Sequence, residues 1–461
     1  HQYLIQHEYG NAQTRDLWNA LSTASGQPVS AIMDSWVNQM GYPLLNISVN
    51  HQDNQSEITC SQSRFVYENI LGQHNPDKTW WHIPITARSA SDAQPISTLM
   101  ESSQTNLSVV PASYGSRGEW IKINPMQTGF YRVKYPTEEL DKLTTPIQSL
   151  VLPAADRLGI QNDAYALARA GHIHVTQFFQ VAQSYINETD ASVCADLAAN
   201  LDSVDTLLWN ESYYPLFQSF ARNIFQPIAR RIGWDAQPGE GHLHSLLRNT
   251  ALTQLGSYED RDALMEAKDR FSMYLDDPSN VHPDIRQVVF SLTAIQSNQD
   301  TYQIMWELQR LTTLQEEKNR LLKALSDFQR PDLLEETLQR SLSEDVRVQD
   351  TISVVTSVAS NRLGLDLAWQ FLMSNWTEFN RRYAHGGFGL MRLVSLTSGF
   401  TTPEKRDEVE SFFQKNPAPA AERSILQSLE RIDLNIAWLK HNHVKLSDWF
   451  DKMKTTDHLE D

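Results

Sequence analysis

Only two cysteines occur in the 461 residues, Cys60 and Cys194. Because we place them in different domains, they exclude a disulfide framework and a thiolate metal site. This scarcity favours a reducing compartment. Six N-x-S/T sequons keep a secreted protein, or one of the secretory pathway, open as the alternative. Their asparagines are Asn46, Asn54, Asn106, Asn187, Asn210 and Asn375.

Basic residues are few, and long apolar runs are absent. Lysine and arginine number 39 against 56 acidic residues, which gives a formal net charge of −17. This excess of negative charge argues against nucleic acid as a partner. No apolar run approaches the roughly 20 residues that a membrane-spanning helix needs, so we expect no membrane partner. The chain starts at His1 without the pattern of a signal peptide, and we expect a processed or truncated product.

The spacing of apolar residues divides the chain into three predicted domains. Residues 1–43 predict short helices, and the apolar face from Val29 to Met40 should pack against something outside that segment. Residues 44–137 predict a β-sandwich of seven to eight strands. Residues 138–461 predict successive amphipathic helices, which indicate an α-solenoid of the HEAT or armadillo kind. The predicted fold is therefore mostly α, with a β-sandwich between a short helical remnant and a superhelical C-terminal domain.

Short runs of alternating or β-branched residues mark the strands of the predicted sandwich. The last of them, between Gly129 and Pro136, is where the apolar period changes from two to about three and a half. Pro84 predicts an edge strand or a bulge. The predicted strands are Leu45–Val49, Glu57–Cys60, Arg64–Tyr67, Trp80–Thr86, Leu107–Val110, Trp120–Ile123 and Thr128–Tyr135.

A search for catalytic motifs finds none that is complete. His7 and Glu8 could start an H-E-x-x-H zinc site, but Asn11 stands where the second histidine is needed. There is no G-x-S-x-G, Walker A or G-x-G-x-x-G motif. The segment from Gly386 to Gly389 lies between predicted helices and favours a turn over a phosphate site.

Histidine pairs and acidic pairs give no better candidate. We expect the three H-x-H pairs at helix starts or ends, where they hold no metal; they are His172 with His174, His242 with His244 and His441 with His443. Two acidic pairs predict solvated helix faces rather than acid and base catalysts; they are Glu316 with Glu317 and Glu335 with Glu336. The sequence thus predicts no catalytic residue and no metal ligand in this chain.

The order of helical segment, strands and helical array resembles the M1 zinc aminopeptidases, most of all their puromycin-sensitive branch. Stretches that resemble the family are Leu17–Trp18, Ser25–Gly26, Met33–Trp36, Gln39–Pro43, Thr128–Tyr135, Asp156–Gly159, Asp163–Ala164 and Leu167–Gly171. Those that resemble the branch are Gly233–Trp234, Pro238–His242, Gln315–Arg320, Val346–Arg347, Gln349–Thr351, Gly386–Phe388, Pro417–Pro419 and Glu422–Arg423.

The resemblance implies a parent enzyme that uses zinc to remove N-terminal residues from peptides. The family's G-A-M-E-N motif, its H-E-x-x-H zinc site and its transition-state tyrosine belong to segments upstream of His1. We therefore expect zinc in the missing catalytic domain, and no activity from this chain alone. Residues 1–43 resemble the end of that domain. The implied partners are peptide substrates and the upstream catalytic domain, in cis or as a separate fragment, and the implied location is cytoplasmic.

In relatives of this family the helical domain closes the peptide chamber, so we expect this chain to help bind substrate. Candidate substrate-binding residues are Arg381, Arg382, Phe388 and Arg392, as cations for a peptide's carboxyl end and an aromatic contact for a side chain. The alternative for the arginines is pairing with acidic helix faces. The alternative function is a non-enzymatic α-solenoid scaffold or binding protein derived from the family.

Overall fold

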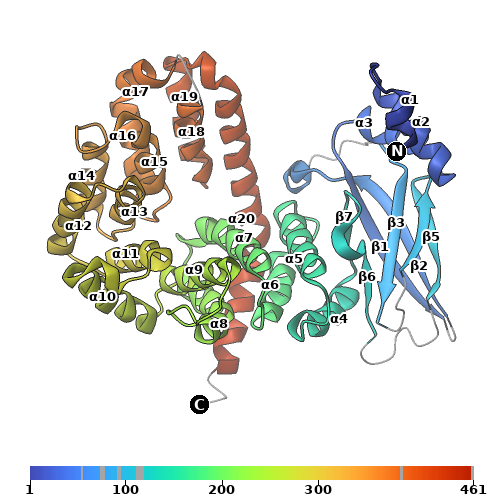
Figure 1. Cartoon of the computed structure of the whole chain (residues 1–461), viewed down its shortest axis with the longest axis horizontal. Helices are drawn as coiled ribbons and strands as arrows, with labels where there is room; N and C mark the ends of the chain where they lie inside the picture. Colours follow the sequence, from blue (N-terminus) through green and yellow to red (C-terminus); the bar gives the residue numbers. More distant parts are fainter. Residues whose placement is uncertain (53–54, 73–77, 91–94, 111–118, 385–387, 458–461) are drawn as a thin grey trace. The chain divides into compact units, whose positions relative to one another are not determined.

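The computed structural model describes residues 1–52, 55–72, 78–90, 95–110, 119–384 and 388–457 (Figure 1). The chain is mostly helical, with a small sheet region toward its N-terminus. It consists of two compact units, residues 1–185, the N-terminal unit, and residues 186–461, the helical unit. Every described strand lies before Pro136, and every described element after that residue is a helix.

The N-terminal unit contains two β-sheets. In the four-stranded sheet the order is β5-β2-β1-β7, with β1 antiparallel to β2 and parallel to β7. In the three-stranded sheet the order is β4-β3-β6. Its described elements are α1 (Gln2–Gln6), α2 (Thr14–Ser25), α3 (Val29–Val37), β1 (Pro43–Gln52), β2 (Gln55–Arg64), η1 (Tyr67–Leu71), β3 (Ile83–Ser89), β4 (Ile96–Met100), β5 (Gln104–Val110), β6 (Ile121–Ile123), η2 (Pro125–Gln127), β7 (Arg132–Lys134), α4 (Thr137–Gln148), α5 (Ala154–Arg169), α6 (Val175–Ala182) and η3 (Gln183–Tyr185).

One predicted strand is absent, and one observed strand was not predicted. The predicted strand Arg64–Tyr67 is absent, because Arg64 ends β2 and Tyr67 begins the 3-10 helix η1. The strand β4 was not predicted. Pro84 is not in an edge strand, since β3 lies between β4 and β6. The described pairs between β3 and β6 begin only at Ala87, so the missing N–H of the proline costs no ladder hydrogen bond on that side.

A polar network joins the last strands to α5 within the N-terminal unit. The Asp163 carboxylate accepts hydrogen bonds from Arg132 Nη1 and from the Val133 N–H, both at 3.0 Å. Lys122 and Asp156 are both buried, with Nζ and Oδ1 3.9 Å apart. Each charge is therefore kept near an opposite one, as burial requires.

The apolar face predicted from Val29 to Met40 packs partly within its own unit. Trp36 donates from Nε1 to the carbonyl of His82 at 2.9 Å, and its ring lies 6.3 Å from that of Phe130. The α3 helix ends at Val37. Val37 is 57% exposed and Met40 81% exposed, so these side chains still present apolar surface.

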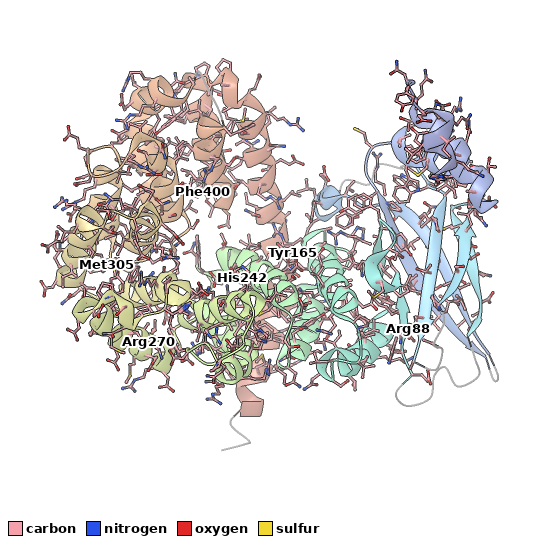
Figure 2. All side chains as sticks on the ribbon, in the orientation of Figure 1. Arg88, Tyr165, His242, Arg270, Met305 and Phe400 are labelled. Atoms are coloured by element: carbon pink, nitrogen blue, oxygen red, sulfur yellow. The ribbon has the colours of Figure 1, made fainter. Side chains whose placement is uncertain are left out.

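Consecutive helices of the helical unit pack on one another and enclose its core. Met305 and Phe400, labelled in Figure 2, belong to two clusters of buried side chains. The described helices are α7 (Ala191–Leu208), α8 (Tyr214–Ile232), α9 (His242–Ser257), α10 (Arg261–Asp276), η4 (Pro278–Asn280), η5 (Pro283–Ile285), α11 (Arg286–Ile295), α12 (Gln299–Leu311), α13 (Gln315–Leu325), α14 (Pro331–Ser341), α15 (Val348–Ala359), α16 (Leu365–Ser374), α17 (Trp376–Tyr383), α18 (Gly389–Ser395), η6 (Leu396–Gly399), α19 (Pro403–Lys415), η7 (Pro419–Ala421) and α20 (Glu422–Asp457).

Glu317 contradicts the prediction of a solvated acidic face. Its side chain is buried and forms ion pairs with Arg286, at 3.2 Å, and with Arg320. Its neighbour Glu316 is exposed and pairs with the same Arg320. Glu317 therefore forms buried ion pairs, whereas Glu316 is a surface charge.

Candidate functional site

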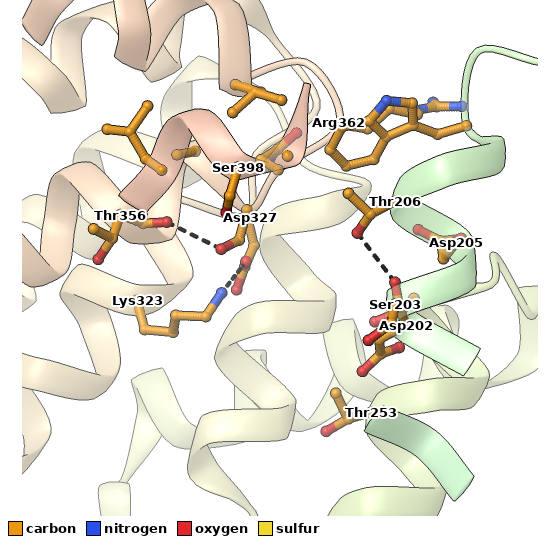
Figure 3. Close-up of a pocket in the computed structure, with 18 of the residues that line it drawn as sticks. Asp202, Ser203, Asp205, Thr206, Thr253, Lys323, Asp327, Thr356, Arg362 and Ser398 are labelled. Carbon is orange, nitrogen blue, oxygen red and sulfur yellow. Dashed lines mark hydrogen bonds and ion pairs between the residues drawn. The ribbon is translucent and has the colours of Figure 1, made fainter. Parts of the chain in front are cut away.

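A cavity of about 930 Å³ lies in the helical unit (Figure 3). Its walls come from α7, α8, α9, α11, α13, α15, α16, α18 and η6 and from segments between helices. This volume is near the upper end of the range for small-molecule sites. The cavity contains side chains of both charges, so it can contact a ligand that carries both.

Three basic side chains line the cavity, and each has a different surrounding. The Arg362 guanidinium lies 5.5 Å from the centre of the Tyr214 ring, within cation–π range. Lys323 forms an ion pair with Asp327, drawn in Figure 3. Arg392 is exposed, and its guanidinium forms no hydrogen bond or ion pair with any residue that the structure describes. Arg392 is thus the lining cation most available to an anionic ligand.

Asp202 and Asp205 lie one turn apart on α7 and face the cavity (Figure 3). Asp202 accepts hydrogen bonds from Gln254 Nε2 at 3.1 Å and from the Tyr258 hydroxyl at 3.4 Å. Protein surrounds Asp202 on its other sides, but the side chain is open to water in the cavity. The surrounding protein removes part of the water from the carboxylate, and this partial desolvation raises the pKa of Asp202 to about 6. The two hydrogen bonds act in the opposite direction and lower it.

Asp205 is the more enclosed of the two carboxylates. It accepts a hydrogen bond from the Tyr214 hydroxyl at 2.8 Å. Burial raises its pKa to about 7, and the negative charge of Asp202 adds to the rise. The Tyr214 hydrogen bond and the charge of Arg362 oppose it. Near neutral pH this site can therefore take up or release a proton.

The structure brings only two of the four predicted substrate-binding residues to this cavity, Phe388 and Arg392. Phe388 is 76% exposed. Arg381 and Arg382 pair instead with Glu378, with N–O distances of 2.7 and 2.6 Å, and these bonds lower the pKa of that carboxyl to about 2. Such contacts are what the alternative of arginines paired with acidic helix faces expects, and the substrate role of both arginines stays a prediction.

Other parts of the candidate site fall outside what sequence reasoning reached. Gly386 and Gly387, expected to form a turn beside Phe388, lie outside the described residues. Arg362, Asp202 and the residues that contact them were missed. No motif contains them, and no sequence spacing relates positions 202, 254 and 362.

The described residues do not provide a zinc site. In that part of the chain, no three His, Cys, Asp or Glu side chains gather where they could hold a metal. The expectation that all H-x-H pairs lie at helix ends is wrong for His441 and His443, which lie inside the long helix α20. His443 Nδ1 lies 3.2 Å from a carboxylate oxygen of Glu211. We therefore derive no catalytic step through zinc from these residues.

None of the described helices combines the length and the apolar character needed to cross a membrane.

Comparison with known proteins identifies the family. Residues 120–434 match the ERAP1-like C-terminal domain family. The chain is 33% identical over 449 residues to aminopeptidase M1-A of Oryza sativa subsp. japonica, which covers 95% of this chain and 50% of that protein. It is 30% identical over 457 residues to glutamyl aminopeptidase of Bos taurus, covering 97% of this chain and 46% of the relative.

A third relative is puromycin-sensitive aminopeptidase of Caenorhabditis elegans, 28% identical over 456 residues, with 95% of this chain and 47% of the relative covered. The chain spans about half the length of these relatives. The finer prediction of the puromycin-sensitive branch stays a prediction. The matches confirm the resemblance to M1 aminopeptidases, and the chain belongs to the ERAP1-like C-terminal domain family.

Proposed function

We propose that this chain is the carboxyl-terminal part of a zinc-dependent M1 aminopeptidase that removes N-terminal residues from peptides. In this proposal the helical unit closes the peptide chamber and binds the distal end of the substrate, and zinc is held by a catalytic domain upstream. The two sheets form a β-sandwich and the helices an α-solenoid. Support comes from the family match and from the cavity, whose basic lining residues suit a peptide carboxylate.

The observation that carries this proposal is the position of Arg392 and Arg362 on one cavity. A guanidinium can bind a carboxylate through two hydrogen bonds, and Arg392 has no partner among the described residues that would compete. Phe388 adds an exposed ring for a neighbouring side chain of the peptide. The proposal therefore assigns the peptide's carboxyl end to Arg392 and Arg362, with Phe388 beside it.

Fluorescence anisotropy tests this assignment with a labelled nonapeptide, used once with a free carboxylate and once as the amide. We expect the free acid to bind more tightly, and Arg392→Gln to weaken it about tenfold or more. Arg381→Gln is the matched control, because it removes the same charge from an arginine that pairs with Glu378 outside the cavity. Equal effects of the two substitutions would contradict the cavity as the site, and no binding of either peptide would contradict the proposal.

Because the proposal places the zinc site in an upstream catalytic domain, it predicts no hydrolysis of an amino-acid anilide by the chain alone. Zinc, measured on protein purified without chelator, should be well below one per chain. An upstream catalytic fragment should co-purify with the chain, with the exposed Val37 and Met40 as part of the contact. Zinc near one per chain together with hydrolysis would refute the assignment of zinc and catalysis to an upstream domain.

We also propose a cytoplasmic location. Mass spectrometry of the native protein tests it at Asn210, an exposed sequon asparagine. A glycan there would establish passage through the secretory pathway instead.

A further inference from the structure

Gln254 carries a buried acceptor atom that no described residue satisfies. Its side chain lines the cavity and is only 6% exposed. Its Nε2 donates to Asp202 at 3.1 Å. Because a carboxylate only accepts, this bond fixes the orientation of the amide and leaves Oε1 as the free end. Within the described part of the chain, Oε1 receives no hydrogen bond. A ligand with N–H donors would supply what is missing.

The carboxylates around Gln254 also lack ion pairs with lysine or arginine among the described residues. Asp202, Asp205 and Glu259 all line the cavity, and none of them forms an ion pair with a lysine or arginine of the described segments. The charge of Arg362 lowers the pKa of Asp205, whereas the pKa of Asp202 is raised by burial and lowered by hydrogen bonds from its neutral donors. This wall of the cavity therefore carries negative charge that no ion pair of the described residues neutralises, and Arg362 offsets it only in part.

Among the described residues, the groups that hydrogen-bond to Asp202 and Asp205 or act on their charge are neutral or negative, apart from Arg362. From α8 comes the Tyr214 hydroxyl, from α9 the Gln254 amide, and from the segment that follows α9 the Tyr258 hydroxyl and Glu259. The other cations that line the cavity are Lys323, which pairs with Asp327, and Arg392, on α18. The cavity is thus lined both by an acidic region and by basic side chains from other elements.

We infer that the acidic corner, which we define as Asp202, Asp205 and Gln254, binds the ammonium or guanidinium group of a lysine or arginine near the carboxyl end of the peptide. The inference rests on the proposed function, since Arg362 and Arg392 hold the carboxylate of the same peptide. A cationic side chain donates to the Asp202 carboxylate, and the unsatisfied Oε1 of the Gln254 amide, which is bonded to that carboxylate through Nε2, is the nearby second acceptor once the side chain adjusts. Asp202 is then a specificity-determining residue, which favours peptides with a basic end over neutral ones.

The proton affinity of the corner supports this assignment. The pKa of Asp202 is raised to about 6 and that of Asp205 to about 7, chiefly by burial. A bound cation lowers both pKa values, so binding a basic peptide near pH 6.5 expels protons. Affinity for such a peptide should therefore fall as the pH drops from 7 to 5, whereas affinity for a neutral peptide should not follow that decrease.

Two labelled nonapeptides test the inference by anisotropy, identical except that one ends in lysine and the other in norleucine, which has the same chain without the ammonium group. Both keep a free carboxylate. The full chain should bind the lysine peptide about tenfold more tightly. Asp202→Asn keeps the size of the side chain and should remove this preference, while changing the norleucine peptide's Kd less than twofold. Asp269→Asn, at an exposed position of α10, is the control and should leave the preference intact.

The outcomes separate this inference from the proposed function. Equal binding of the two peptides by the parent chain, or equal effects of Asp202→Asn and Asp269→Asn, would overturn the basic preference alone. Absence of binding by either peptide would overturn the proposed function and this inference with it.

Calorimetry adds a readout that a structural role of the aspartates would not change. Binding of the lysine peptide at pH 6.5, in two buffers with different ionisation enthalpies, should release protons from the parent chain and fewer from Asp205→Asn. Proton release that is unchanged by Asp205→Asn would overturn the role of Asp205 in the corner. A thermal unfolding transition like that of the parent shows that each variant is folded.

Discussion

Replacing Asp205 with asparagine should stabilise the helical unit at pH 8 and much less at pH 5. In the folded chain, burial raises the pKa of Asp205 from 3.8 to about 7. The folded state therefore holds the proton more tightly than the unfolded state. Stability from this group is fully present below about pH 4 and is lost as the pH rises through 7, where the buried carboxyl becomes charged. Asparagine can still accept the hydrogen bond from Tyr214 and carries no charge at any pH.

The size of the effect follows from the pKa. A rise of about three pH units, at about 1.4 kcal/mol for each, gives an upper limit of about 4 kcal/mol at pH 8. Because Asp205 lines the cavity, solvent can screen its charge and reduce this limit, and we expect a gain of about 1–3 kcal/mol. For a domain of 150–250 residues, this corresponds to a Tm increase of about 2–4 °C per kcal/mol.

Differential scanning calorimetry at pH 5, 6, 7 and 8 measures the difference in Tm between Asp205→Asn and the parent chain. That difference should grow with pH most steeply between about 5 and 6, where only the folded state holds the proton, and should level off above about pH 7. Asp269→Asn, at an exposed position of α10, should give a small difference that does not change with pH. A difference for Asp205→Asn that is flat with pH, or that shrinks as the pH rises, would refute the burial argument.

Three further substitutions test the packing, each by the free energy of unfolding in urea. Glu317→Gln removes the buried carboxylate shared by two arginines and should cost about 3 kcal/mol or more. Glu316→Gln, at a 77% exposed side chain, should cost about 0–1 kcal/mol. Equal costs would contradict the stabilising role of the buried Glu317 ion pairs. Gly256→Ala places a methyl group 2.3 Å from a buried leucine side chain and should cost about 1–3 kcal/mol. Gly10→Ala, where the nearest atom is 3.6 Å away, should cost about 0.5 kcal/mol or less. An unchanged free energy of unfolding for Gly256→Ala would show that α9 can shift. Asp163→Asn weakens the two hydrogen bonds that hold β7 and should cost the N-terminal unit about 2 kcal/mol, and no loss would mean that β7 is held by other contacts.

The type of element was predictable where local periodicity decides it. Many helices that follow Pro136 repeat their apolar residues at helical spacing, because they bury one face against their neighbours; α5, with four consecutive buried residues from Ala166 to Arg169, is an exception. The strands were harder. The β2 strand continues through Ser61, Gln62 and Ser63, which have the composition of a turn. Gln62 stabilises them through tertiary contacts, accepting from the Trp81 N–H and donating to the Trp81 carbonyl, both at 2.8 Å. Such contacts between distant residues cannot be predicted from the local spacing of apolar residues.

The cavity shows a second limit of prediction, because its side chains come from distant positions that meet only through helix packing. Phe388 and Arg392 were found through family resemblance, and their sequence alone would not place them on a cavity. Asp202 meets Gln254 across 52 positions, where α7 packs against α9. Each residue by itself has the pattern of an ordinary exposed helix position.

Arg362 illustrates how the fold sets the position of a charge that no motif marks. It follows α15 in a polar break whose sequence predicts only a turn. Its neighbour Asn361 donates from Nδ2 to the carbonyls of Ser326 and Phe328, both at 3.0 Å. These two bonds tie the break after α15 to the segment that follows α13, and so hold Arg362 at the cavity wall beside Tyr214. Asn361 is 7% exposed, so buried hydrogen bonds made one residue away hold the backbone from which the Arg362 side chain extends.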